Sequence, residues 1–391
     1  MSLQSTVADR RFAVDRQGLI RRLRAVLPTP ALLVEEEDMR PYDCDGLTAY
    51  RQLPLIVALP EDEAQVQAIL AICHELRAPV VARGAATGLS GGAMPHPDGV
   101  LVSLAKLKKI LRVDPVSRTA VVQPGVRNLA VSEAAAPHGL YYAPDPSSQI
   151  ACTIGGNVAE NSGGVHCLKY GLTVHNVMRV RGLTIEGEVV EFGNAALDAP
   201  GYDLLALVNG SEGLLAMITE VTVRLTPKPE LAQVVIASFA DVGKAGDAVA
   251  SIIAAGIIPA GLEMMDRKAI HAVEPYVNAG YDMDAEGILL CESDGTPEEV
   301  AEEIARMVAV LENSGASGIR VSQDESERLR FWAGRKAAFP AVGRMTPDYL
   351  CMDGTIPRKR LAEMLQAIVG LSAKYGLRCA NVFHAGDGNL H

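Results

Sequence analysis

The sequence has 391 residues, of which 49% are hydrophobic and 21% are charged. Its length predicts two or three domains, and its composition excludes a disordered or collagen-like chain. The formal net charge is −11, because 47 acidic residues outnumber 36 lysines and arginines, and this balance argues against a nucleic-acid-binding protein. The longest uncharged apolar run, residues 248–262, contains glycine and proline and is too short to cross a bilayer. We therefore expect a cytoplasmic protein with no transmembrane segment, for which a peripheral association with the inner membrane stays open.

The seven cysteines are widely separated and include no Cys-x-x-Cys pair. Zinc ribbons and iron–sulfur clusters need cysteines grouped at such short spacings. We therefore expect reduced, mostly buried thiols and no iron–sulfur cluster held by this chain alone.

The first half of the chain begins with a helical lead-in over residues 1–50, in which apolar residues at helical spacing predict a helix over 17–27. From residue 54 the pattern changes. The run PLIVALP predicts a buried strand, residues 61–77 predict a helix with acidic residues in its first turn, and APVVAR predicts a second strand. This β–α–β rhythm indicates an α/β domain with a largely buried sheet.

Further strands are predicted at GVLVSL, at RTAVVQPG and around residues 177–192, with a long irregular stretch over residues 144–171 between them. The prolines Pro227 and Pro229 then predict a domain boundary, which divides the chain into residues 51–229 and 230–391. Beyond the boundary the pattern predicts a smaller two-layer α+β domain, with strands at 232–239 and 287–292 and helices at 242–255 and 297–313.

Three glycine-rich segments in the first domain predict a binding site for a phosphate-bearing ligand. The first, RGAATGLSGGA, follows a predicted strand directly, where glycine lets the backbone approach a phosphate and present its N–H groups. The others are IGGNVAENSGG over residues 154–164 and GSEG over residues 210–213. Their spacing matches neither the dinucleotide-binding Gly-x-Gly-x-x-Gly fingerprint nor a nucleotide-hydrolysing P-loop. For the first segment taken alone, a tight loop without a ligand is the alternative.

Together with PDPSSQIACTIGGNVAENSGGV and GSEGLLAMITEVTV, the first segment resembles the flavin domain of the vanillyl-alcohol-oxidase type. Within that group the sequence is similar to the FAD-linked D-2-hydroxy-acid dehydrogenases, and most similar to their glycolate-oxidising branch. The resemblance runs from about residue 41 to the last residue. It implies an α+β fold with a PCMH-type FAD-binding domain of two α/β subdomains over residues 51–229. A smaller α+β substrate, or cap, domain would follow over residues 230–391.

The resemblance also assigns the residues that would hold FAD. The glycine loop contains no histidine, so the flavin would be bound without a covalent link. The loop would wrap the pyrophosphate, and later residues would line the isoalloxazine and ribityl portion or lie near the adenine end. In that order, the implied residues are Arg83, Gly84, Ala85, Thr87, Gly88, Leu89 and Ser90; Pro144, Thr153, Gly156, Asn157 and Asn161; and Glu212, Gly213 and Ile218. For His166 and Cys167 we favour ordinary packing.

The segment FWAGRKAAFP holds the only tryptophan and a candidate substrate-binding arginine, Arg335. A guanidinium suits a carboxylate because its fork can bind both oxygens. Arg335 matches the arginine that grips the substrate carboxylate in the resembling family. Without that match, a solvated arginine on a helix would be the better interpretation.

The C-terminal segment NVFHAGDGNLH crowds His384, Asp387, Asn389 and His391 into the turn after a predicted strand. Imidazoles suit a zinc-like or iron-like divalent ion, although a lone histidine is usually structural. The resemblance implies that His384 and His391 bind such a metal and that Asn389 lies near the substrate. Arg335 would fix the carboxylate of a 2-hydroxy acid while the metal eases loss of the hydroxyl proton and hydride leaves C2 for the flavin.

Two departures from the family pattern bear on activity. Relatives continue into a Glu-His-Gly segment that supplies the remaining metal ligand and the base, whereas this sequence stops at His391. We therefore expect a C-terminally shortened form with an incomplete metal site and impaired or absent catalysis. Cys351 stands where relatives with dicarboxylate substrates carry a lysine, which favours a small monocarboxylate such as glycolate or D-lactate.

The resemblance favours the flavin subunit of a glycolate-oxidising complex, which would pass electrons to a second flavin-type subunit and an iron–sulfur subunit. A stand-alone D-lactate dehydrogenase is one alternative, and a flavin-binding assembly subunit without its own catalysis is another. Arg335, His384 and His391 favour an enzyme, because a scaffold would not need them.

Overall fold

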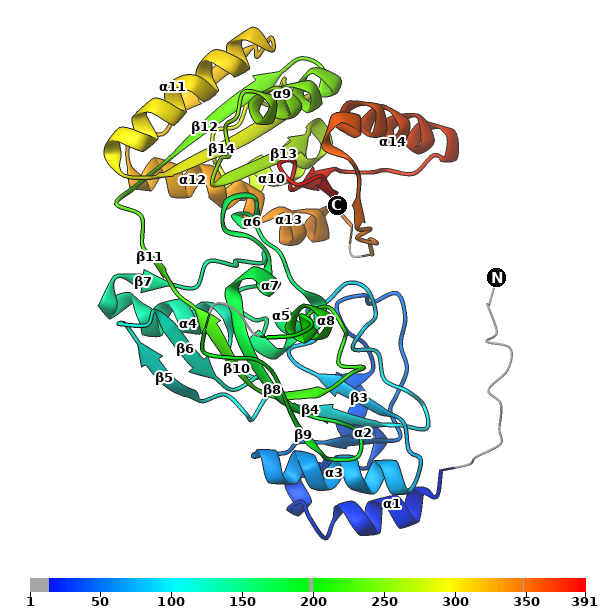
Figure 1. Ribbon diagram of the computed structural model, residues 1–391. Helices are drawn as coiled ribbons and strands as arrows, with labels where there is room; N and C mark the ends of the chain where they lie inside the picture. The colour runs from blue at the N-terminus through cyan, green and yellow to red at the C-terminus, as the bar shows by residue number, and fades with distance from the viewer. Residues whose placement is uncertain (1–13, 197–199, 347) are drawn as a thin grey trace. The chain divides into compact units, whose positions relative to one another are not determined.

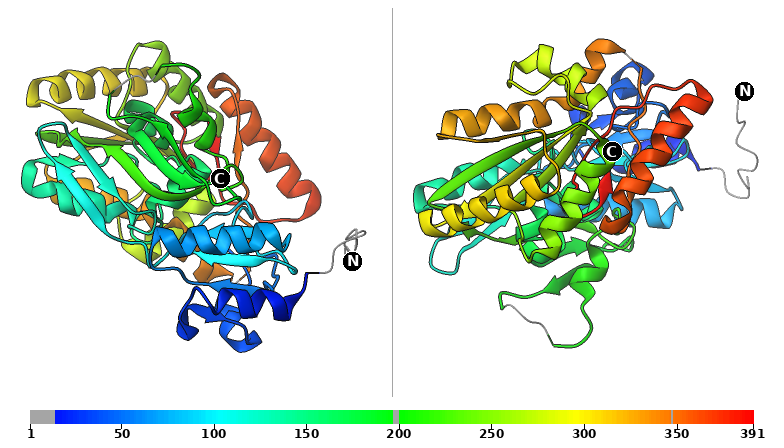
Figure 2. Two further views of the ribbon diagram at one scale, coloured as in Figure 1. Left: turned by 60° about the horizontal axis from the view of Figure 1, so that its bottom comes forward. Right: turned by 90° about the horizontal axis from the view of Figure 1, so that it is seen from above.

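The structure is a computed structural model that describes residues 14–196, 200–346 and 348–391 (Figures 1 and 2). Residues 1–13 of the predicted lead-in lie outside the described residues. The chain divides into two compact units. The first comprises the described residues up to Tyr142, Ser148–Ser162 and Thr173–Thr226, and the second comprises Ala143–Ser147, Gly163–Leu172 and Pro227–His391. Two short segments from the first half of the sequence therefore belong to the second unit.

The first sheet of the first unit follows the predicted β–α–β rhythm. Its order is β1-β2-β4-β3, in which β2, β4 and β3 run parallel and β1 is antiparallel to β2. Helix α3 (Glu63–Glu75) begins at Asp62, whose carboxylate accepts a hydrogen bond from the Gln65 N–H. The apolar stripe of α3 packs in one core with the sheet and α1 (Arg16–Leu23). The strands are β1 (Leu32–Leu33), β2 (Ile56–Ala58), β3 (Val80–Arg83) and β4 (Val100–Ser103).

The second sheet of this unit is antiparallel, in the order β5-β6-β10-β8-β9. One apolar cluster joins it to α4 (Asn128–Ala135) and α5 (Ile154–Glu160). The expectation of an irregular stretch over residues 144–171 is therefore wrong for α5. The strands are β5 (Ile110–Asp114), β6 (Thr119–Val122), β8 (Val177–Leu183), β9 (Val189–Gly193) and β10 (Met217–Arg224). The shorter elements are α2 (Glu36–Met39), α7 (Thr173–Asn176), α8 (Leu204–Val208), β7 (Leu140–Tyr141), β11 (Thr226–Pro227) and 3₁₀ turns at Thr29–Ala31, Arg40–Tyr42 and Ala136–His138.

The second unit contains a five-stranded antiparallel sheet in the order β15-β12-β14-β13-β17. Successive side chains alternate between its faces, so the two faces form two separate apolar clusters. Helices α9, α11 and α14 cover one face, and α10, α12 and α13 cover the other (Figure 1). The strands are β12 (Leu231–Phe239), β13 (Gly261–Asp266), β14 (Gly287–Gly295), β15 (Gly318–Val321) and β17 (Val382–Phe383).

The helices on the first of these faces are α9 (Val242–Ala254), α11 (Pro297–Asn313) and α14 (Leu361–Tyr375). Those on the second are α10 (Arg267–Val277), α12 (Glu325–Lys336) and α13 (Ala338–Met345). The unit also contains α6 (Cys167–Tyr170), β16 (Gly354–Thr355), β18 (Asn389–Leu390) and a 3₁₀ turn at Arg358–Arg360. Across the described ranges, no helix has both the length and the apolar character needed to span a membrane.

The alternation places two glutamates in the layer between the sheet and α12. Glu263 of β13 and Glu292 of β14 are 1% and 2% exposed. Glu292 pairs in register with Gly261, and Glu263 pairs with Leu290, so the two glutamates are diagonal neighbours on one face. A buried carboxylate is costly unless it is paired. The partners of these two glutamates therefore define the chemistry of this face.

Candidate functional site

In the first unit the three glycine-rich segments lie against one another. A Cβ atom on Gly84 would overlap Thr153 Oγ1, and one on Gly92 would lie 2.8 Å from Glu212 Oε2. The loop over residues 83–93 thus contacts both of the other segments at positions where there is no room for a side chain. The structure therefore brings Gly84 close to Thr153 and Gly156, and the end of the same loop close to Glu212.

Two buried polar atoms at this loop have no hydrogen-bond partner among the described residues, Thr153 Oγ1 and Arg83 Nε. Thr153 precedes α5, but its hydroxyl does not cap the helix. Arg83 is 4% exposed and donates to the Ala93 carbonyl, and burial lowers its pKa. Unsatisfied buried polar atoms are costly, so a ligand with hydrogen-bonding groups fits this cradle. These residues are therefore compatible with a bound flavin dinucleotide.

The side chains of the two predicted asparagines form hydrogen bonds with other residues of the protein. Asn157 is 2% exposed, and its Oδ1 accepts a hydrogen bond from Asn128 at 3.0 Å. Asn161 ends α5 with a φ of 51°, and its Oδ1 accepts from the Val174 N–H at 2.9 Å. Both side chains shape the loop. A direct role in binding the flavin stays a prediction for them.

The remaining predicted flavin residues are spread over several elements. Ala85, Thr87, Gly88, Leu89 and Ser90 lie on the loop after β3, and Gly156 lies beside Gly84. Ile218 is buried in β10, and Gly213 has a φ of 74° in the turn before that strand. Pro144 belongs to the second unit.

Two glutamates face the glycine loop. Glu160 Oε2 accepts a hydrogen bond from the Ser90 hydroxyl at 3.3 Å. Burial raises the pKa of Glu160, and the neighbouring charge of Glu212 raises it further. Carboxylates repel phosphate oxygens, so these two side chains suit hydroxyl or amino groups of a ligand rather than its pyrophosphate.

In the second unit, α12 positions the predicted substrate-binding arginine. The helix begins at Asp324, whose carboxylate accepts a hydrogen bond from the Glu327 N–H at 2.8 Å. Arg328, Trp332 and Arg335 are spaced by four and three residues, so they lie on one face of the helix. This face is buried, because Trp332 and Arg335 are each 3% exposed. Arg335 is therefore not a solvated helix arginine.

Gly334 lets a tyrosine pack closely against α12. A Cβ atom on Gly334 would overlap the ring and hydroxyl of Tyr281, and that hydroxyl donates to the Phe331 carbonyl. Glycine inside a helix costs about 1 kcal/mol relative to alanine, and the close contact explains its presence here. Tyr281 thereby fixes the turn of α12 that carries Arg335.

Arg335 is paired with a carboxylate. Its Nε donates to Glu263 Oε2 at 2.7 Å, and Glu263 Oε1 lies 2.8 Å from His384 Nδ1. Burial alone would raise the pKa of Glu263, but the charges of His384 and Arg335 outweigh burial and lower it. Glu263 is therefore an ionised carboxylate that joins the arginine to the histidine.

Three buried polar atoms at this site have no hydrogen-bond partner among the described residues: Arg335 Nη2, Asn389 Oδ1 and His391 Nδ1. Arg335 is linked to His384 through Glu263, and His384 bridges to Asn389 through the backbone. The unsatisfied atoms thus belong to one cluster. It offers a cationic donor and a neutral acceptor to a ligand.

Backbone contacts fix the turn that carries the C-terminal site residues. Strand β17 pairs with β13 and ends directly before His384. Gly388 has a φ of 84°, and a Cβ atom there would overlap the Ile356 carbonyl. The Asn389 N–H donates to Asp387 Oδ1 at 3.1 Å. These contacts bring His384 and Asn389 together at the end of the sheet.

The two predicted metal-binding histidines lie close together. Their ring centroids are 5.1 Å apart with an interplanar angle of 83°. His384 Nδ1 faces Glu263, and His391 Nδ1 lies 3.2 Å from Asp353 Oδ1 as an ion pair without hydrogen-bond geometry. Metal-bound imidazoles commonly place the other ring nitrogen against a carboxylate, so the pair suits two ligands of a divalent ion. Within the described residues, however, no group of three or more His, Cys, Asp or Glu side chains is arranged to hold one.

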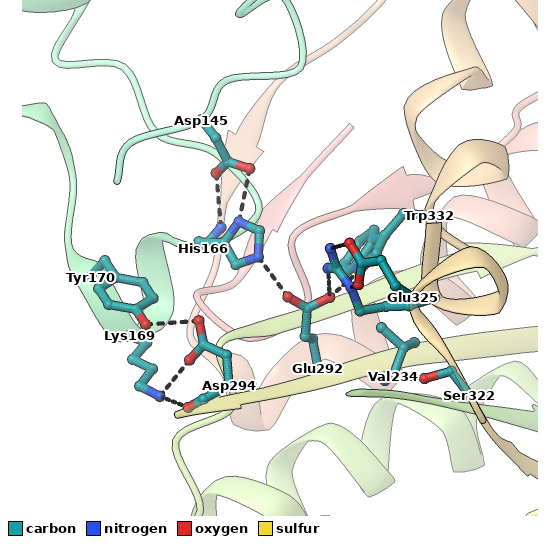
Figure 3. A network of polar contacts seen from close by, with 11 residues as sticks. Asp145, His166, Lys169, Tyr170, Val234, Glu292, Asp294, Ser322, Glu325 and Trp332 are labelled. Atoms are coloured by element: carbon teal, nitrogen blue, oxygen red, sulfur yellow. Dashed lines mark hydrogen bonds and ion pairs between the residues drawn. The ribbon is translucent and has the colours of Figure 1, made fainter. Parts of the chain in front are cut away.

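A second network surrounds Glu292 (Figure 3). Glu292 Oε2 accepts hydrogen bonds from Trp332 and, at 2.9 Å, from Arg328, while Oε1 lies 3.1 Å from His166 Nε2. The other ring nitrogen of His166 lies 2.8 Å from Asp145. The prediction of ordinary packing is therefore wrong for His166, whose ring is held between two carboxylates.

The charges of this network hold each other in the ionised state. Burial alone would lower the pKa of His166, but Asp145 and Glu292 outweigh burial and raise it well above 6.5. Burial alone would raise the pKa of Glu292, but His166, Arg328 and Trp332 lower it to about 2. At neutral pH the network contains an imidazolium between two carboxylates.

The same segment is held to the sheet by Asp294 of β14. Lys169 donates to the Asp294 carboxylate and carbonyl, and the Tyr170 hydroxyl donates to the carboxylate at 2.7 Å (Figure 3). Residues 163–172 therefore join the second unit through charged contacts with residues more than a hundred positions away.

Sequence reasoning missed Glu263, Glu292 and Tyr281. A signal existed for the glutamates, because GLEMM and GILLCES each contain a single carboxylate in an otherwise apolar run. Alternation within a strand puts such a residue on a buried face, where an ionisable group is rare and usually paired. Tyr281 gives no comparable signal.

Two protein-family models match the chain. The model of the FAD binding domain matches residues 54–193, and the model of the C-terminal domain of FAD linked oxidases matches residues 228–391. Glycolate oxidase subunit GlcD of Escherichia coli (strain K12) is 61% identical, over 97% of this chain and 76% of the relative. The GlcD subunit of Bacillus subtilis (strain 168) is 38% identical, over 90% of this chain and 75% of the relative. A D-lactate dehydrogenase of Archaeoglobus fulgidus is 32% identical, over 86% of this chain and 74% of the relative.

Two solved structures share the fold. p-Cresol methylhydroxylase with substrate bound has a TM-score of 0.79 at 16% identity, over 96% of this chain and 81% of that chain. An alkyldihydroxyacetonephosphate synthase has a TM-score of 0.78 at 18% identity, over 96% of this chain and 79% of that chain. These likenesses confirm the predicted PCMH-type FAD-binding fold.

The fold, the glycine-loop cradle and the two matched domains define an FAD-linked oxidoreductase. The chain belongs to the family of FAD-linked oxidases that includes the GlcD subunits.

Proposed function

We propose that the protein oxidises a small 2-hydroxy acid, glycolate in the first instance, to the 2-oxo acid. Two relatives named glycolate oxidase subunit GlcD support this substrate. The observation that carries the proposal is Arg335, which is 3% exposed, bound through Nε to Glu263 and without a partner at Nη2. A carboxylate ligand would satisfy the guanidinium that the fold leaves unsatisfied.

The side chains of the second unit bind and orient the substrate. Arg335 holds the carboxylate, and Asn389 Oδ1 accepts a hydrogen bond from the substrate hydroxyl. FAD, when bound, would accept the hydride that leaves C2, while a general base would take the hydroxyl proton. Burial of the cluster keeps water away from the reacting atoms and strengthens each of these polar contacts.

FAD is bound without a covalent link by residues 51–229, and residues 230–391 form the substrate domain. The loop over Arg83–Ser90 and the Thr153 hydroxyl contact the cofactor, and Glu212 and Gly213 lie near its adenine end. The unsatisfied Arg83 Nε and Thr153 Oγ1 support this assignment.

A zinc-like or iron-like divalent ion at His384 and His391 belongs to the same proposal. The carboxylates behind the two imidazoles support it. The proposed oxidation does not depend on the ion, because the described residues offer no group of three or more His, Cys, Asp or Glu side chains that could hold it.

The word subunit in the names of the GlcD relatives supports assembly into a complex. The proposed partners are a second flavin-type subunit and an iron–sulfur subunit. The proposed location is the cytoplasm. A stand-alone D-lactate dehydrogenase is the second candidate, supported by the relative of that name.

The test is anaerobic addition of glycolate to the full chain loaded with FAD. The flavin absorbance should bleach with glycolate and not with L-lactate. Bleaching by D-lactate without bleaching by glycolate would favour the second candidate. A flavin that stays oxidised with both acids would leave only the assembly role.

The Thr153→Val substitution tests the cofactor site. Valine keeps the shape of the side chain and removes the unpartnered hydroxyl, so FAD should bind roughly 5-fold more weakly, or about 1 kcal/mol. A titration that follows flavin fluorescence measures the affinity. Thr119→Val, on the distant strand β6, should leave it unchanged, and equal affinities for all three proteins would remove Thr153 from the site.

A further inference from the structure

We propose that Glu263 is a positioning residue that aims the guanidinium of Arg335 at the substrate carboxylate and fixes the hydrogen of His384 on Nδ1. The proposal rests on the proposed function, because it concerns the same substrate site. Glu263 itself does not touch the reacting atoms. It acts through the two side chains that it joins.

Glu263 holds the arginine through a single nitrogen, Nε. A carboxylate commonly binds an arginine through two parallel hydrogen bonds, which would occupy both Nε and one terminal nitrogen. Here one oxygen of Glu263 accepts from Arg335 Nε at 2.7 Å, and the other oxygen lies 2.8 Å from His384 Nδ1. Arg335 Nη2 consequently stays buried without a partner among the described residues. Glu263 thus holds the guanidinium through Nε and leaves Nη2 for the substrate carboxylate.

Glu263 also determines which ring nitrogen of His384 carries the hydrogen. An ionised carboxylate only accepts hydrogen bonds, so the nitrogen that faces Glu263 must carry the hydrogen. When His384 is neutral, this N–H is its only one, and the lone pair is then on Nε2. That nitrogen is available to accept a proton or to ligate an ion, whereas the opposite tautomer would offer an N–H instead.

The surrounding elements hold Glu263 and its two partners in place. Glu263 is 1% exposed and lies on β13, which pairs with β14 on one side and with β17 on the other. Strand β17 leads directly into His384, and Tyr281 fixes the turn of α12 that carries Arg335. Three elements therefore meet at one carboxylate. Such support is what holds a site within a few tenths of an ångström of its working geometry.

Glu263→Gln is the test, because glutamine has the same shape but one acceptor and one donor group. If its carbonyl accepts from Arg335 Nε, its amide N–H points at His384 Nδ1 and moves the histidine hydrogen to Nε2. If the amide turns over, two donors meet at Arg335. The first orientation reverses the tautomer of His384, and the second loses the contact with Arg335.

Anaerobic stopped-flow mixing of the FAD-loaded full chain with glycolate measures the effect. The limiting rate of flavin reduction should fall about 10- to 100-fold in Glu263→Gln, the usual cost of losing such a supporting partner. FAD affinity should not change. The matched control is Glu292→Gln, a buried substitution on the same face of the same sheet, which contacts neither Arg335 nor His384. Its folded fraction should reduce flavin within about 3-fold of the wild-type rate.

Binding of oxalate, measured by calorimetry, gives a readout that needs no turnover, because oxalate has no hydride to lose. The affinity should also fall at least several-fold in Glu263→Gln. If Glu263→Gln does not fold, Glu263→Asp serves instead, since its shorter side chain keeps the charge but cannot reach both partners. Wild-type rates and oxalate affinities in either variant would overturn the proposal.

Failure of the proposed function gives different results from failure of the role of Glu263. A wild-type protein that binds oxalate but is not reduced by glycolate would refute glycolate oxidation, and the oxalate comparison would still decide the role of Glu263. A wild-type protein that binds neither acid would refute both.

Discussion

Glu263 and Glu292 are diagonal neighbours on one face of the same sheet, and each joins a histidine to an arginine of α12. The two networks differ in how many guanidinium nitrogens of the arginine have a hydrogen-bond partner. Arg328 uses all three of its nitrogens, with Nε and Nη2 bound to Glu325 and Nη1 bound to Glu292. Arg335 is bound through Nε, and its Nη2 has no partner among the described residues.

The same residue types, a glutamate between a histidine and an arginine, form a structural clamp around Glu292 and a binding site around Glu263. Around Glu292 the two cations, His166 and Arg328, are surrounded by three carboxylates, Asp145, Glu292 and Glu325. Each nitrogen of His166 and Arg328 already has a carboxylate partner, so no nitrogen of these two cations is left for a ligand. Around Glu263 one carboxylate serves both an arginine and a histidine, and the unsatisfied guanidinium can take a further carboxylate.

The largest expected effect separates the two arginines. Arg335→Lys keeps the charge but loses the planar fork, so kcat/KM for glycolate should fall about 100- to 1000-fold, or about 3–4 kcal/mol. Arg328→Lys, seven residues earlier on the same helix, should change kcat/KM less than about 3-fold. Steady-state kinetics of the two FAD-loaded variants provide the measurement. Similar losses in both would erase the distinction between clamp and site.

The next largest effect is on the stability that the Glu292 clamp gives the fold. Glu292→Gln removes the charge between His166 and Arg328 and should lower the free energy of unfolding by about 3 kcal/mol. Trp332 is the only tryptophan and donates to Glu292, so its fluorescence reports on this network during urea denaturation of the flavin-free chain. An unchanged urea midpoint would mean that the network contributes no net stability.

The pH dependence of stability sharpens the same contrast. The pKa of Glu292 is lowered from 4.5 to about 2 in the folded protein, so its ionised form stabilises the fold above about 4.5, and this contribution is lost as the pH falls toward 2. The loss should reach about 2 kcal/mol by pH 3. The difference between wild type and Glu292→Gln should therefore shrink over this range, as followed by Trp332 fluorescence in urea.

His166 works in the opposite direction. Its pKa is raised well above 6.5, so its contribution is complete below about 6.5 and is lost as the pH rises through the folded value. Wild-type stability should decline at alkaline pH more steeply than that of a His166→Asn variant. Parallel alkaline profiles would show that the imidazolium does not stabilise the fold.

The smallest effect compares two carboxylates behind the two histidines. Asp353 has a side chain that is 51% exposed and lies 3.2 Å from His391 without hydrogen-bond geometry, whereas Glu263 is buried. Exposed pairs contribute at most about 1 kcal/mol, so Asp353→Asn should slow flavin reduction no more than about 5-fold. A loss equal to that of Glu263→Gln would mean that burial does not set the strength of this support.

Much of the secondary structure could be predicted from local patterns. The helix predicted over residues 297–313 has those bounds in α11, where Thr296 and Glu299 form a reciprocal cap. The helix predicted over 61–77 is two residues shorter at each end. Periodicity and capping are properties of neighbouring residues, so they can be read without the fold.

The elements that build the substrate site were harder to predict. Strand β13 and helix α10 were not expected, because GLEMMD has a charged residue inside the run and α10 contains a proline. The resemblance identified Arg335, His384, Asn389 and His391, and the structure places them in one cluster. It did not identify Glu263, which joins two of them.

By itself, the sequence determined the family, the glycine loops and most of the helices and strands, because motifs, caps and periodicity depend on residues close together in the chain. Only the tertiary structure decided which charges meet. His166 and Glu292 are 126 positions apart, and Arg335 and Glu263 are 72 apart. Their pairing depends on the register of β13 against β14 and on how α12 packs across that face. The two arginines are alike in the sequence, and the carboxylates opposite them make one a clamp and leave the other open to a ligand.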